Sequence, residues 1–336
     1  MMEADPNEVA GRVLRRLKAY YGRDGLEEVV INRPGRVWIK RRGGAWEDIE
    51  TPEIDYKYLA RVCKVLANIN NAQFSEAEIP IVACELPGDP FRFQAVMGPN
   101  VRYETSDRRG VAIAIRALTA NTAIGFENYG LVSGVDLPGR AETIVSEFGL
   151  SMDHVKAISR IVERHESIIV SGATSTGKTT FTNKIIELIP REARVITVED
   201  ARELSVPHRN RVHLMVPRSK GSNAIGYAEI IDALVRLTPD WIICGELSVA
   251  NAQPIYATMG KGHPIVTTVH AGTPEEAVAA FANNMSIAGG SVSNDPDALA
   301  QSIRAQIGMV IQLERRDGKR RVVEIDYPSS RVRESA

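Results

Sequence analysis

The segment Gly172–Thr180 constrains this chain more than any other feature of its sequence. It contains Gly-Ala-Thr-Ser-Thr-Gly-Lys-Thr-Thr, which matches the phosphate-binding loop pattern G-x-x-x-x-G-K-[ST]. The apolar run Ile168–Val170 precedes it, and apolar residues at helical spacing follow it. This context predicts a buried strand, a loop that binds phosphate, and a helix whose positive N-terminus points at the phosphate.

Each residue type in this loop has a physical role. Gly172 and Gly177 allow the backbone to bend around phosphate oxygens, so that its N–H groups form a positive nest. The amine of Lys178 is expected to reach the β- and γ-phosphates, and the hydroxyl of Thr179 is expected to bind Mg²⁺. The alternative interpretation is an ordinary glycine turn before a helix. The other loop residues predicted to bind the nucleotide are Ala173, Thr174, Ser175, Thr176 and Thr180.

Strand-like and helix-like segments alternate through the second half of the chain. The apolar runs Val195–Val198, Trp241–Cys244 and Ile265–Val269 are separated by segments with helical spacing. Continuous apolar strands between helices are typical of a parallel sheet that is covered on both faces. We therefore predict an α/β fold for this half, with a hairpin around Asp317–Gly318 near its end.

The first half is predicted to form a separate α+β domain. Residues 29–39 are typical of two strands joined at Pro34–Gly35, since proline presets φ and glycine tolerates positive φ. Alternating apolar residues at 91–97 and 111–115 indicate further strands. Glycine and proline are dense at 129–140, which indicates a linker. The predicted organisation is a domain at residues 1–130, a linker at 131–145 and a second domain at 146–336.

Composition excludes several classes of function. The chain has 336 residues, a formal net charge of -1, 44% hydrophobic and 25% charged residues, as in an ordinary globular protein. Because the chain has no excess of positive charge, we expect no stable nucleic-acid binding. No apolar run approaches the ~18 residues that span a bilayer. The three cysteines lie far apart without a Cys-x-x-Cys pair, which argues against a zinc site or a disulfide framework.

Polar residues follow the predicted strands at the edge where the phosphate loop lies. Hydrolysis needs a carboxylate near the metal and the attacking water, and ligands bind beyond the carboxyl ends of such strands. Glu246, just after Trp241–Cys244, is the leading candidate, and Glu199 or Asp200 is a second. His270 ends another strand and is a candidate contact of the γ-phosphate. The alternatives are helix caps or surface charges for the acids, and a hydrogen-bonded structural histidine.

Several motifs together resemble the secretion-superfamily ATPases. The N-terminal segment Val30–Trp38 narrows the resemblance to the type IV secretion traffic ATPases, which drive conjugation and effector export. The resemblance spans the chain from about residue 26 to residue 326. The motifs are, in chain order, Walker A at Gly172–Thr180, the Asp box at Glu199–Leu204, Walker B at Arg236–Glu246, and the His box from Gly262-His263 to His270-Ala271.

This resemblance implies a fold, an activity and an assembly. The fold is an N-terminal PAS-like α+β domain, a linker and a C-terminal RecA-like P-loop domain that hydrolyses ATP with Mg²⁺. Six copies would form a ring in the cytoplasm, peripheral to the inner membrane and beside inner-membrane components of the secretion machine, with ATP between the two domains. The residues implicated are Lys178 and Thr179 at phosphate and Mg²⁺, Glu246 at water and metal, Glu199 as an acidic helper, His270 near the γ-phosphate, and Arg92 and Arg116 as a clamp on the nucleotide.

A few positions depart from the pattern of this family. Ser248 stands where the family has an arginine two residues after the Walker B glutamate, so that an inter-subunit or phosphate contact is lost or supplied elsewhere. Lys261 replaces a common threonine of the His box, and Pro254 is predicted to interrupt the following helix. These departures bear on turnover and subunit coupling rather than on the fold.

The main hypothesis is an ATP-driven motor that energises a type IV secretion system. One alternative is a type IV pilus or type II secretion ATPase, although extension ATPases of that kind commonly carry a four-cysteine zinc module. Another is a nucleotide-gated scaffold with little turnover, which the Ser248 departure favours. A third alternative is a P-loop kinase or helicase, although the sequence shows neither a second substrate pocket nor a continuous basic surface for nucleic acid.

The basic segment around Arg15, Arg16 and Lys18 has two interpretations: it either docks on anionic lipid or packs on its own domain.

Overall fold

The computed structural model describes residues 6–22, 25–41, 44–89, 91–103, 109–117, 152–216, 225–288, 296–316 and 319–329. The chain divides into two compact units. Unit 1 comprises Met1–Gly134, Asn210–Ile225 and Asp232–Thr238, and unit 2 comprises Val135–Arg209, Gly226–Ile231 and Pro239–Ala336. The predicted linker at 131–145 lies outside the described residues, so the predicted boundaries stay predictions. The grouping of two later segments with unit 1 was not predicted from the sequence.

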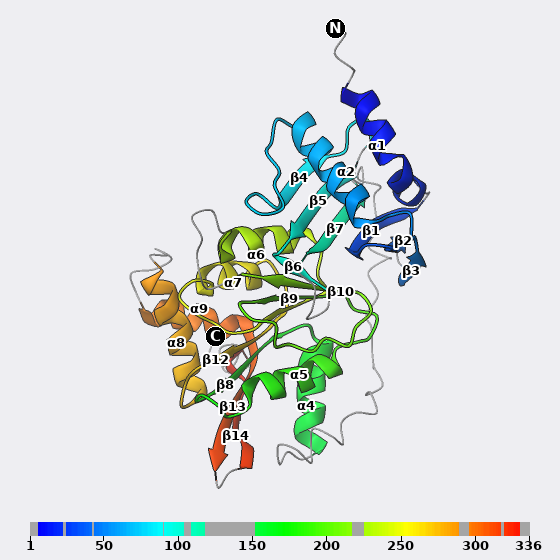
Figure 1. The fold of residues 1–336 in the computed structure, drawn as a ribbon. Helices are drawn as coiled ribbons and strands as arrows, with labels where there is room; N and C mark the ends of the chain where they lie inside the picture. The colour runs from blue at the N-terminus through cyan, green and yellow to red at the C-terminus, as the bar shows by residue number, and fades with distance from the viewer. Residues whose placement is uncertain are drawn as a thin grey trace, which may run out of the picture. The chain divides into compact units, whose positions relative to one another are not determined.

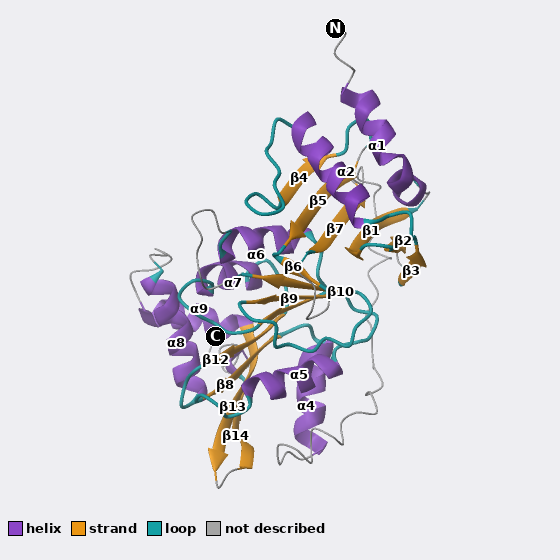
Figure 2. Cartoon of the chain, in the orientation of Figure 1, coloured by secondary structure: helices purple, strands orange, loops and turns teal. Residues whose placement is uncertain are grey.

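Unit 1 is built on an antiparallel sheet with the strand order β3-β2-β1-β7-β5-β4, as Figures 1 and 2 show. Two helices, α1 and α2, pack their apolar residues against one face of this sheet. The predicted α+β class is therefore confirmed. The elements are α1 (Pro6–Tyr21), β1 (Leu26–Arg33), β2 (Arg36–Arg41), β3 (Trp46–Glu50), α2 (Tyr56–Ile69), β4 (Ile81–Glu85), β5 (Phe91–Gly98), β6 (Val101–Arg102), β7 (Gly110–Ala117) and β10 (Arg211–Met215), the last paired with β6.

Local sequence signals account for the first hairpin and the first helix of unit 1. Gly35, at the predicted turn between β1 and β2, has a φ of +76°, which a side chain would disfavour. In α1, the apolar residues Leu14 and Leu17 are buried in the core of unit 1. On the same helix, Lys18 pairs with Asp89 at 2.8 Å. The apolar face of this basic helix therefore packs on its own domain, which was the second of the two interpretations above.

Unit 2 is an α/β structure whose strands lie in the order β14-β13-β8-β12-β11-β9. All neighbouring pairs from β13 to β9 are parallel, and β14 returns antiparallel beside β13, which confirms the predicted fold class. The elements are α4 (Met152–Glu163), β8 (Ser167–Gly172), α5 (Lys178–Leu188), β9 (Val195–Glu199), α6 (Tyr227–Arg236, shared with unit 1), β11 (Trp241–Cys244), α7 (Ala252–Met259), β12 (Ile265–Val269), α8 (Pro274–Ile287), α9 (Pro296–Gln306), β13 (Ile307–Arg316) and β14 (Lys319–Asp326).

Helices cover both faces of this parallel sheet, as Figure 2 shows. On one face, α4 and α5 contribute Ile158, Phe181 and Ile185 to a core that also contains Val170 and Trp241 from the strands. On the other face lie α7, α8 and α9, where α8 contacts β8, β12 and β13. Burial on both sides explains why these strands are continuous apolar runs rather than alternating ones.

The pairing register places the carboxyl ends of four strands at one level. Cys244 of β11 is opposite Val198 of β9 and Thr267 of β12. In turn, Val269 of β12 is opposite Ser171 of β8. The residues that directly follow these ends therefore share one edge of the sheet, where ligands of open α/β sheets bind.

Two details near this edge concern helix ends. Pro254 does not interrupt α7, because the helix begins at Ala252 and proline is tolerated in a first turn, where its missing N–H has no partner to lose. The other detail is the N-terminal cap of α8, where the Thr273 hydroxyl accepts from the backbone N–H of Glu276 at 3.1 Å. Within the described ranges, no helix combines the length and apolarity required to cross a bilayer.

We predict that Thr273→Ala lowers the free energy of unfolding of unit 2 by about 1 kcal/mol, because it leaves the Glu276 N–H without its acceptor. Urea unfolding followed by fluorescence and circular dichroism measures this loss. Thr273→Ser keeps the hydroxyl and serves as the matched control, with a loss of a few tenths of a kcal/mol at most. Equal stability of the alanine and wild-type proteins would show that the cap contributes nothing.

Candidate active site

The predicted phosphate loop joins β8 to α5 with the backbone geometry of an anion nest. Ser175 has a φ of +65° and Gly177 a φ of +95°, both in the left-handed region. Such residues turn successive backbone N–H groups toward a common point, where they attract an anion. Gly177 is the residue that precedes α5, so the positive end of the helix adds to the same field.

Gly172 is required here by close packing of the backbone. A Cβ atom at this position would lie 2.6 Å from the backbone oxygen of Leu313 in β13 and 2.7 Å from the Thr176 hydroxyl. The clash with the Leu313 oxygen could be relieved only by a shift of the backbone. The first glycine of the loop therefore lets β8 run directly against β13 at the point where the loop begins.

Lys178 holds its ammonium group at the start of the loop. Its Nζ donates to the backbone oxygens of Gly172 at 2.8 Å and Ala173 at 3.0 Å. Burial lowers the pKa of this amine, and the neighbouring Glu246 carboxylate acts in the opposite direction. A partly desolvated cation bound to neutral carbonyls is poorly compensated, so phosphate oxygens are better partners for it.

His270 links Lys178 to Glu246. Its Nδ1 lies 3.0 Å from Nζ of Lys178, and its Nε2 lies 3.0 Å from Oε1 of Glu246. An ammonium group has no acceptor, so Nδ1 must accept from it, and the imidazole proton then resides on Nε2, the nitrogen that faces the Glu246 carboxylate. The structure thus brings three of the predicted catalytic residues into one chain of close polar contacts, which we name the Lys–His–Glu chain.

The segment that carries Glu246 is fixed from both sides. Leu247 N–H donates to the backbone oxygen of Thr268 at 2.8 Å, and the Thr268 hydroxyl donates to the backbone oxygen of Gly245 at 2.9 Å. Asn251 is fully buried, and its Nδ2 donates to the backbone oxygen of Glu246 at 2.8 Å. Its Oδ1 accepts from the N–H of Ser248 at 2.9 Å. Asn251 was not predicted; its only sequence signal is an asparagine just before a helix.

Glu199 is buried, and its carboxylate oxygens accept hydrogen bonds from nearby groups. Oε1 accepts from the N–H groups of Glu203 at 2.9 Å and Leu204 at 2.8 Å, and Oε2 accepts from the Thr197 hydroxyl at 2.9 Å. Glu199 also lies beside Gly245, since a Cβ at that glycine would be 3.4 Å from its Cγ. It therefore holds the Asp-box loop against the Walker B segment, and its role as an acidic helper stays a prediction.

The residues predicted to bind Mg²⁺ are compatible with that ion. Thr179 is half-buried at the second position of α5, and the Glu246 side chain is 39% exposed at the same edge of the sheet. Within the part of the chain that the structure describes, no cluster of three or more His, Cys, Asp or Glu side chains forms a metal cage. A hydroxyl and one carboxylate fit Mg²⁺, which takes its other ligands from phosphates and water.

The predicted arginine clamp lies in unit 1. Arg92 of β5 is directly opposite Arg116 of β7, and both are exposed. Glu85 is opposite Arg92 on one side, and Glu28 is opposite Arg116 on the other. Cross-strand partners project from the same face of a sheet, so the two arginines lie together. Their contact with nucleotide stays a prediction.

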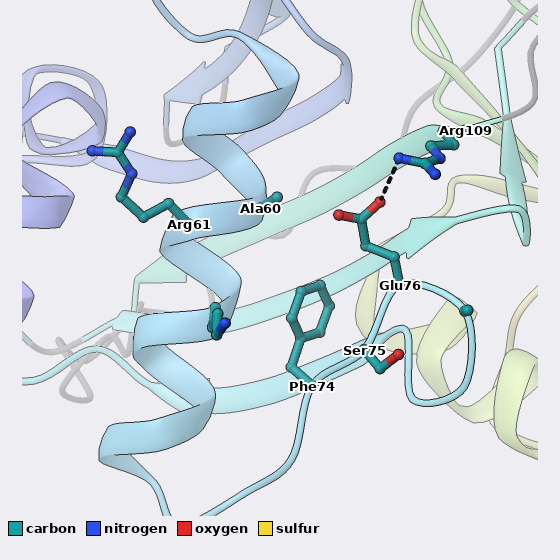
Figure 3. A pocket seen from close by; sticks show the side chains of 8 residues that line it. Ala60, Arg61, Phe74, Ser75, Glu76 and Arg109 are labelled. Carbon is teal, nitrogen blue, oxygen red and sulfur yellow. Dashed lines mark ion pairs between the residues drawn. The ribbon is translucent and has the colours of Figure 1, made fainter.

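Unit 1 also contains a shallow hollow of about 490 Å³, drawn in Figure 3. It is wide open to solvent, and its ion pair joins Arg109 to Glu76 at 3.9 Å. It carries none of the predicted catalytic groups, and we assign it no chemistry. Its lining comprises Ala60, Arg61, Lys64, Phe74, Ser75, Glu76, Ala77 and Arg109.

Comparisons with known proteins all identify secretion system proteins as similar to this chain. A family model described as "Type II/IV secretion system protein" matches residues 139–323, which is more than half of the chain. The type IV secretion system protein VirB11 of Bartonella henselae is 31% identical, over 90% of this chain and 88% of that protein. The type IV secretion system protein PtlH of Bordetella pertussis is 28% identical, over 94% of each chain.

A solved structure supports the fold. The crystal structure of the VirB11 ATPase from the Brucella suis type IV secretion system, in complex with sulphate, superposes with a TM-score of 0.79. The match covers 96% of this chain and 99% of that chain at 24% sequence identity. It confirms an N-terminal domain followed by a P-loop ATPase-type domain in this chain.

We predict that His270→Ala lowers kcat for nucleotide hydrolysis by about 100-fold, because Glu246 loses the imidazole that lies 3.0 Å from its carboxylate and orients it. The dissociation constant for ADP changes little, since the loop and Lys178 remain. Steady-state kinetics and calorimetric titration measure the two quantities. His263→Ala, at the opposite end of β12, is the control and keeps wild-type turnover. Wild-type kcat in the His270 variant would remove the histidine from the catalytic arrangement.

We predict that Asn251→Ala lowers kcat by about tenfold or more while the KM for nucleotide stays within about twofold of wild type. The variant frees the backbone that carries Glu246 without touching the loop that binds phosphate. Asn283→Ala, an exposed asparagine on α8, is the control. A rise in KM at constant kcat would contradict a positioning role for Asn251.

Proposed function

Because the chain belongs to the Type II/IV secretion system protein family, we propose that it is an ATP-hydrolysing motor that energises a type IV secretion system. The observation that carries the proposal is the Lys–His–Glu chain at the mouth of the phosphate loop. It couples the cation that binds phosphate to the carboxylate that acts on water, which a site for nucleotide binding alone does not need.

In the proposed reaction, the phosphates of ATP enter the nest formed by the loop and replace the carbonyl partners of Lys178. The Lys178 ammonium then contacts the β- and γ-phosphates, and its contact with His270 is free to rearrange toward the γ-phosphate. Mg²⁺, held by the Thr179 hydroxyl and near Glu246, would neutralise charge on the phosphate oxygens. The site therefore supplies positioning and charge compensation, which dominate phosphoryl transfer.

Glu246 orients the attacking water in this scheme. Oε1 of its carboxylate lies 3.0 Å from Nε2 of His270, and the other oxygen remains for a water molecule. Asn251 and Thr268 hold the backbone on either side of it. Glu199 keeps the neighbouring loop in place rather than contacting water directly, which is compatible with a helper role.

The proposed motor also needs a coupling step between its parts. Arg92 and Arg116 are adjacent, exposed cations on neighbouring strands, and they suit the γ-phosphate of a nucleotide as domains close. Closure on ATP and reopening after hydrolysis would supply the working stroke. The proposed assembly is a homo-hexamer in the cytoplasm, peripheral to the inner membrane and in contact with inner-membrane components of the secretion machine.

The second candidate function is a nucleotide-gated scaffold that turns over slowly. It is favoured by Ser248, which supplies no cation where relatives of the family carry arginine. A pilus-type ATPase is not favoured by the relatives described above, which are type IV secretion proteins.

We predict that Glu246→Gln abolishes steady-state ATP hydrolysis, with a fall of at least about 100-fold, and leaves nucleotide binding within about threefold of wild type. The amide keeps the size of the side chain and its hydrogen bonding but cannot act on water as a carboxylate does. Turnover and light scattering after size exclusion are measured on the same samples. Glu192→Gln, an exposed glutamate of unit 2, is the matched control.

Two outcomes separate the hypotheses. A wild-type hexamer whose turnover disappears in the Glu246 variant supports the motor. A wild-type protein that binds nucleotide tightly with negligible turnover, unchanged in the variant, supports the scaffold.

A further inference from the structure

The C-terminal hairpin of unit 2 extends along the phosphate loop. Leu313 of β13 is opposite Gly172, the last residue of β8, and β13 continues beyond it to Arg316. The chain then returns as β14, in which Arg320 is opposite Arg315. The hairpin (orange to red in Figure 1) therefore passes the carboxyl edge of the sheet at the position of the loop.

Arg320 lies directly on the end of the phosphate loop. A Cβ atom at Gly177 would be 2.6 Å from Cδ of Arg320 and 2.9 Å from its Nε. The Arg320 side chain thus occupies the space that the missing side chain of Gly177 leaves open. Its Nη1 also donates to the Thr180 hydroxyl at 3.2 Å. Two contacts on different residues fix the guanidinium beside the first turn of α5.

The guanidinium has unused capacity for an anion. It carries five N–H donors, and the Thr180 hydroxyl takes one of them. Within the described residues, no carboxylate forms an ion pair with Arg320, and its side chain is exposed. An exposed, uncompensated arginine that is anchored at its stem is well suited to bind phosphate.

The position of Arg320 indicates which phosphate it reaches. Lys178 Nζ marks the start of the loop, at Gly172 and Ala173, and it serves the β- and γ-phosphates. Arg320 lies at the opposite end of the loop, at Gly177 and Thr180. Since the loop follows the phosphate chain, the end that lies away from the Lys178 contacts corresponds to the α-phosphate and the nucleoside.

We propose that Arg320 is a nucleotide-binding residue, contributed by the C-terminal hairpin, that contacts the α-phosphate end of the bound nucleoside di- or triphosphate. This inference rests on the proposed function, because it adds a second cation to the same site. It assigns to the hairpin a role in substrate affinity. An α-phosphate contact is made equally by substrate and product, so Arg320 contributes to the binding of both.

The test measures dissociation constants of full-length protein for Mg-ADP and for a non-hydrolysable Mg-ATP analogue by calorimetry. Arg320→Met keeps an unbranched apolar stem over Gly177 and removes the charge. We expect both dissociation constants to rise by the same factor, about tenfold, as for loss of one charge-assisted hydrogen bond. Arg320→Lys should recover part of the affinity, because it restores the charge without the planar fork.

Controls separate this inference from the proposed function. Arg321→Met removes the neighbouring exposed arginine of β14 and should bind both nucleotides as wild type does. Lys178→Ala should abolish binding, and if it does not, the proposed nucleotide site itself fails. If Lys178→Ala abolishes binding and Arg320→Met does not weaken it, only the role of Arg320 is overturned.

Two further results bear on the assignment. Loss of affinity for the ATP analogue alone would place Arg320 at the γ-phosphate and overturn the assignment to the α-phosphate end. A lower thermal unfolding midpoint in nucleotide-free Arg320→Met and Arg320→Lys, with unchanged dissociation constants, would show that Arg320 only stabilises the fold and would overturn the proposal. Equal midpoints with weaker binding of both nucleotides would support the proposal.

Discussion

The contacts of the buried Lys178 ammonium group are the interactions on which the site in unit 2 depends. A cation that has left water needs partners, and here it takes two loop carbonyls and the imidazole of His270. Those partners are available only because β8 and β12 are adjacent and in register, with Ser171 opposite Val269. The same register aligns β11, which places Glu246 within reach of His270. The geometry of the Lys–His–Glu chain is therefore a consequence of parallel strand pairing.

Much of this site was predictable because its signals are local. The phosphate loop requires glycine where the backbone has positive φ, as at Gly177, and a lysine directly after it. Buried parallel strands give apolar runs, so the residue that follows each run is predicted at the carboxyl edge, as for His270. The hairpin at Gly35 was predicted for the same reason, since it depends on a few neighbouring residues.

Other features escaped prediction because they depend on contacts between distant parts of the chain. Arg320 is 140 residues from Thr180 in sequence, and its position follows from the length of β13 beyond Gly172, which no local pattern encodes. Asn251 precedes a helix, where asparagine usually caps, yet its side chain instead holds the Glu246 segment. The grouping of residues 210–225 with unit 1 likewise depends on tertiary pairing of β10 with β6.

The structure shows the physical consequence of having Ser248 where the family pattern has an arginine. Its backbone N–H is held by Asn251, so the path of the chain after Glu246 is fixed by a neutral amide rather than by a charged side chain. The segment keeps its shape but adds no positive charge beside the phosphates. Charge compensation for a nucleotide must then come from elsewhere, and among the described residues of unit 2 Lys178 lies against the start of the loop and Arg320 against its end. Under the proposal for Arg320, a hairpin that carries one of these cations would link nucleotide affinity to the position of the C-terminal strands. In the proposed motor, nucleotide binding would thereby act on the edge of the sheet as well as on its centre, which gives the motor a second element to move.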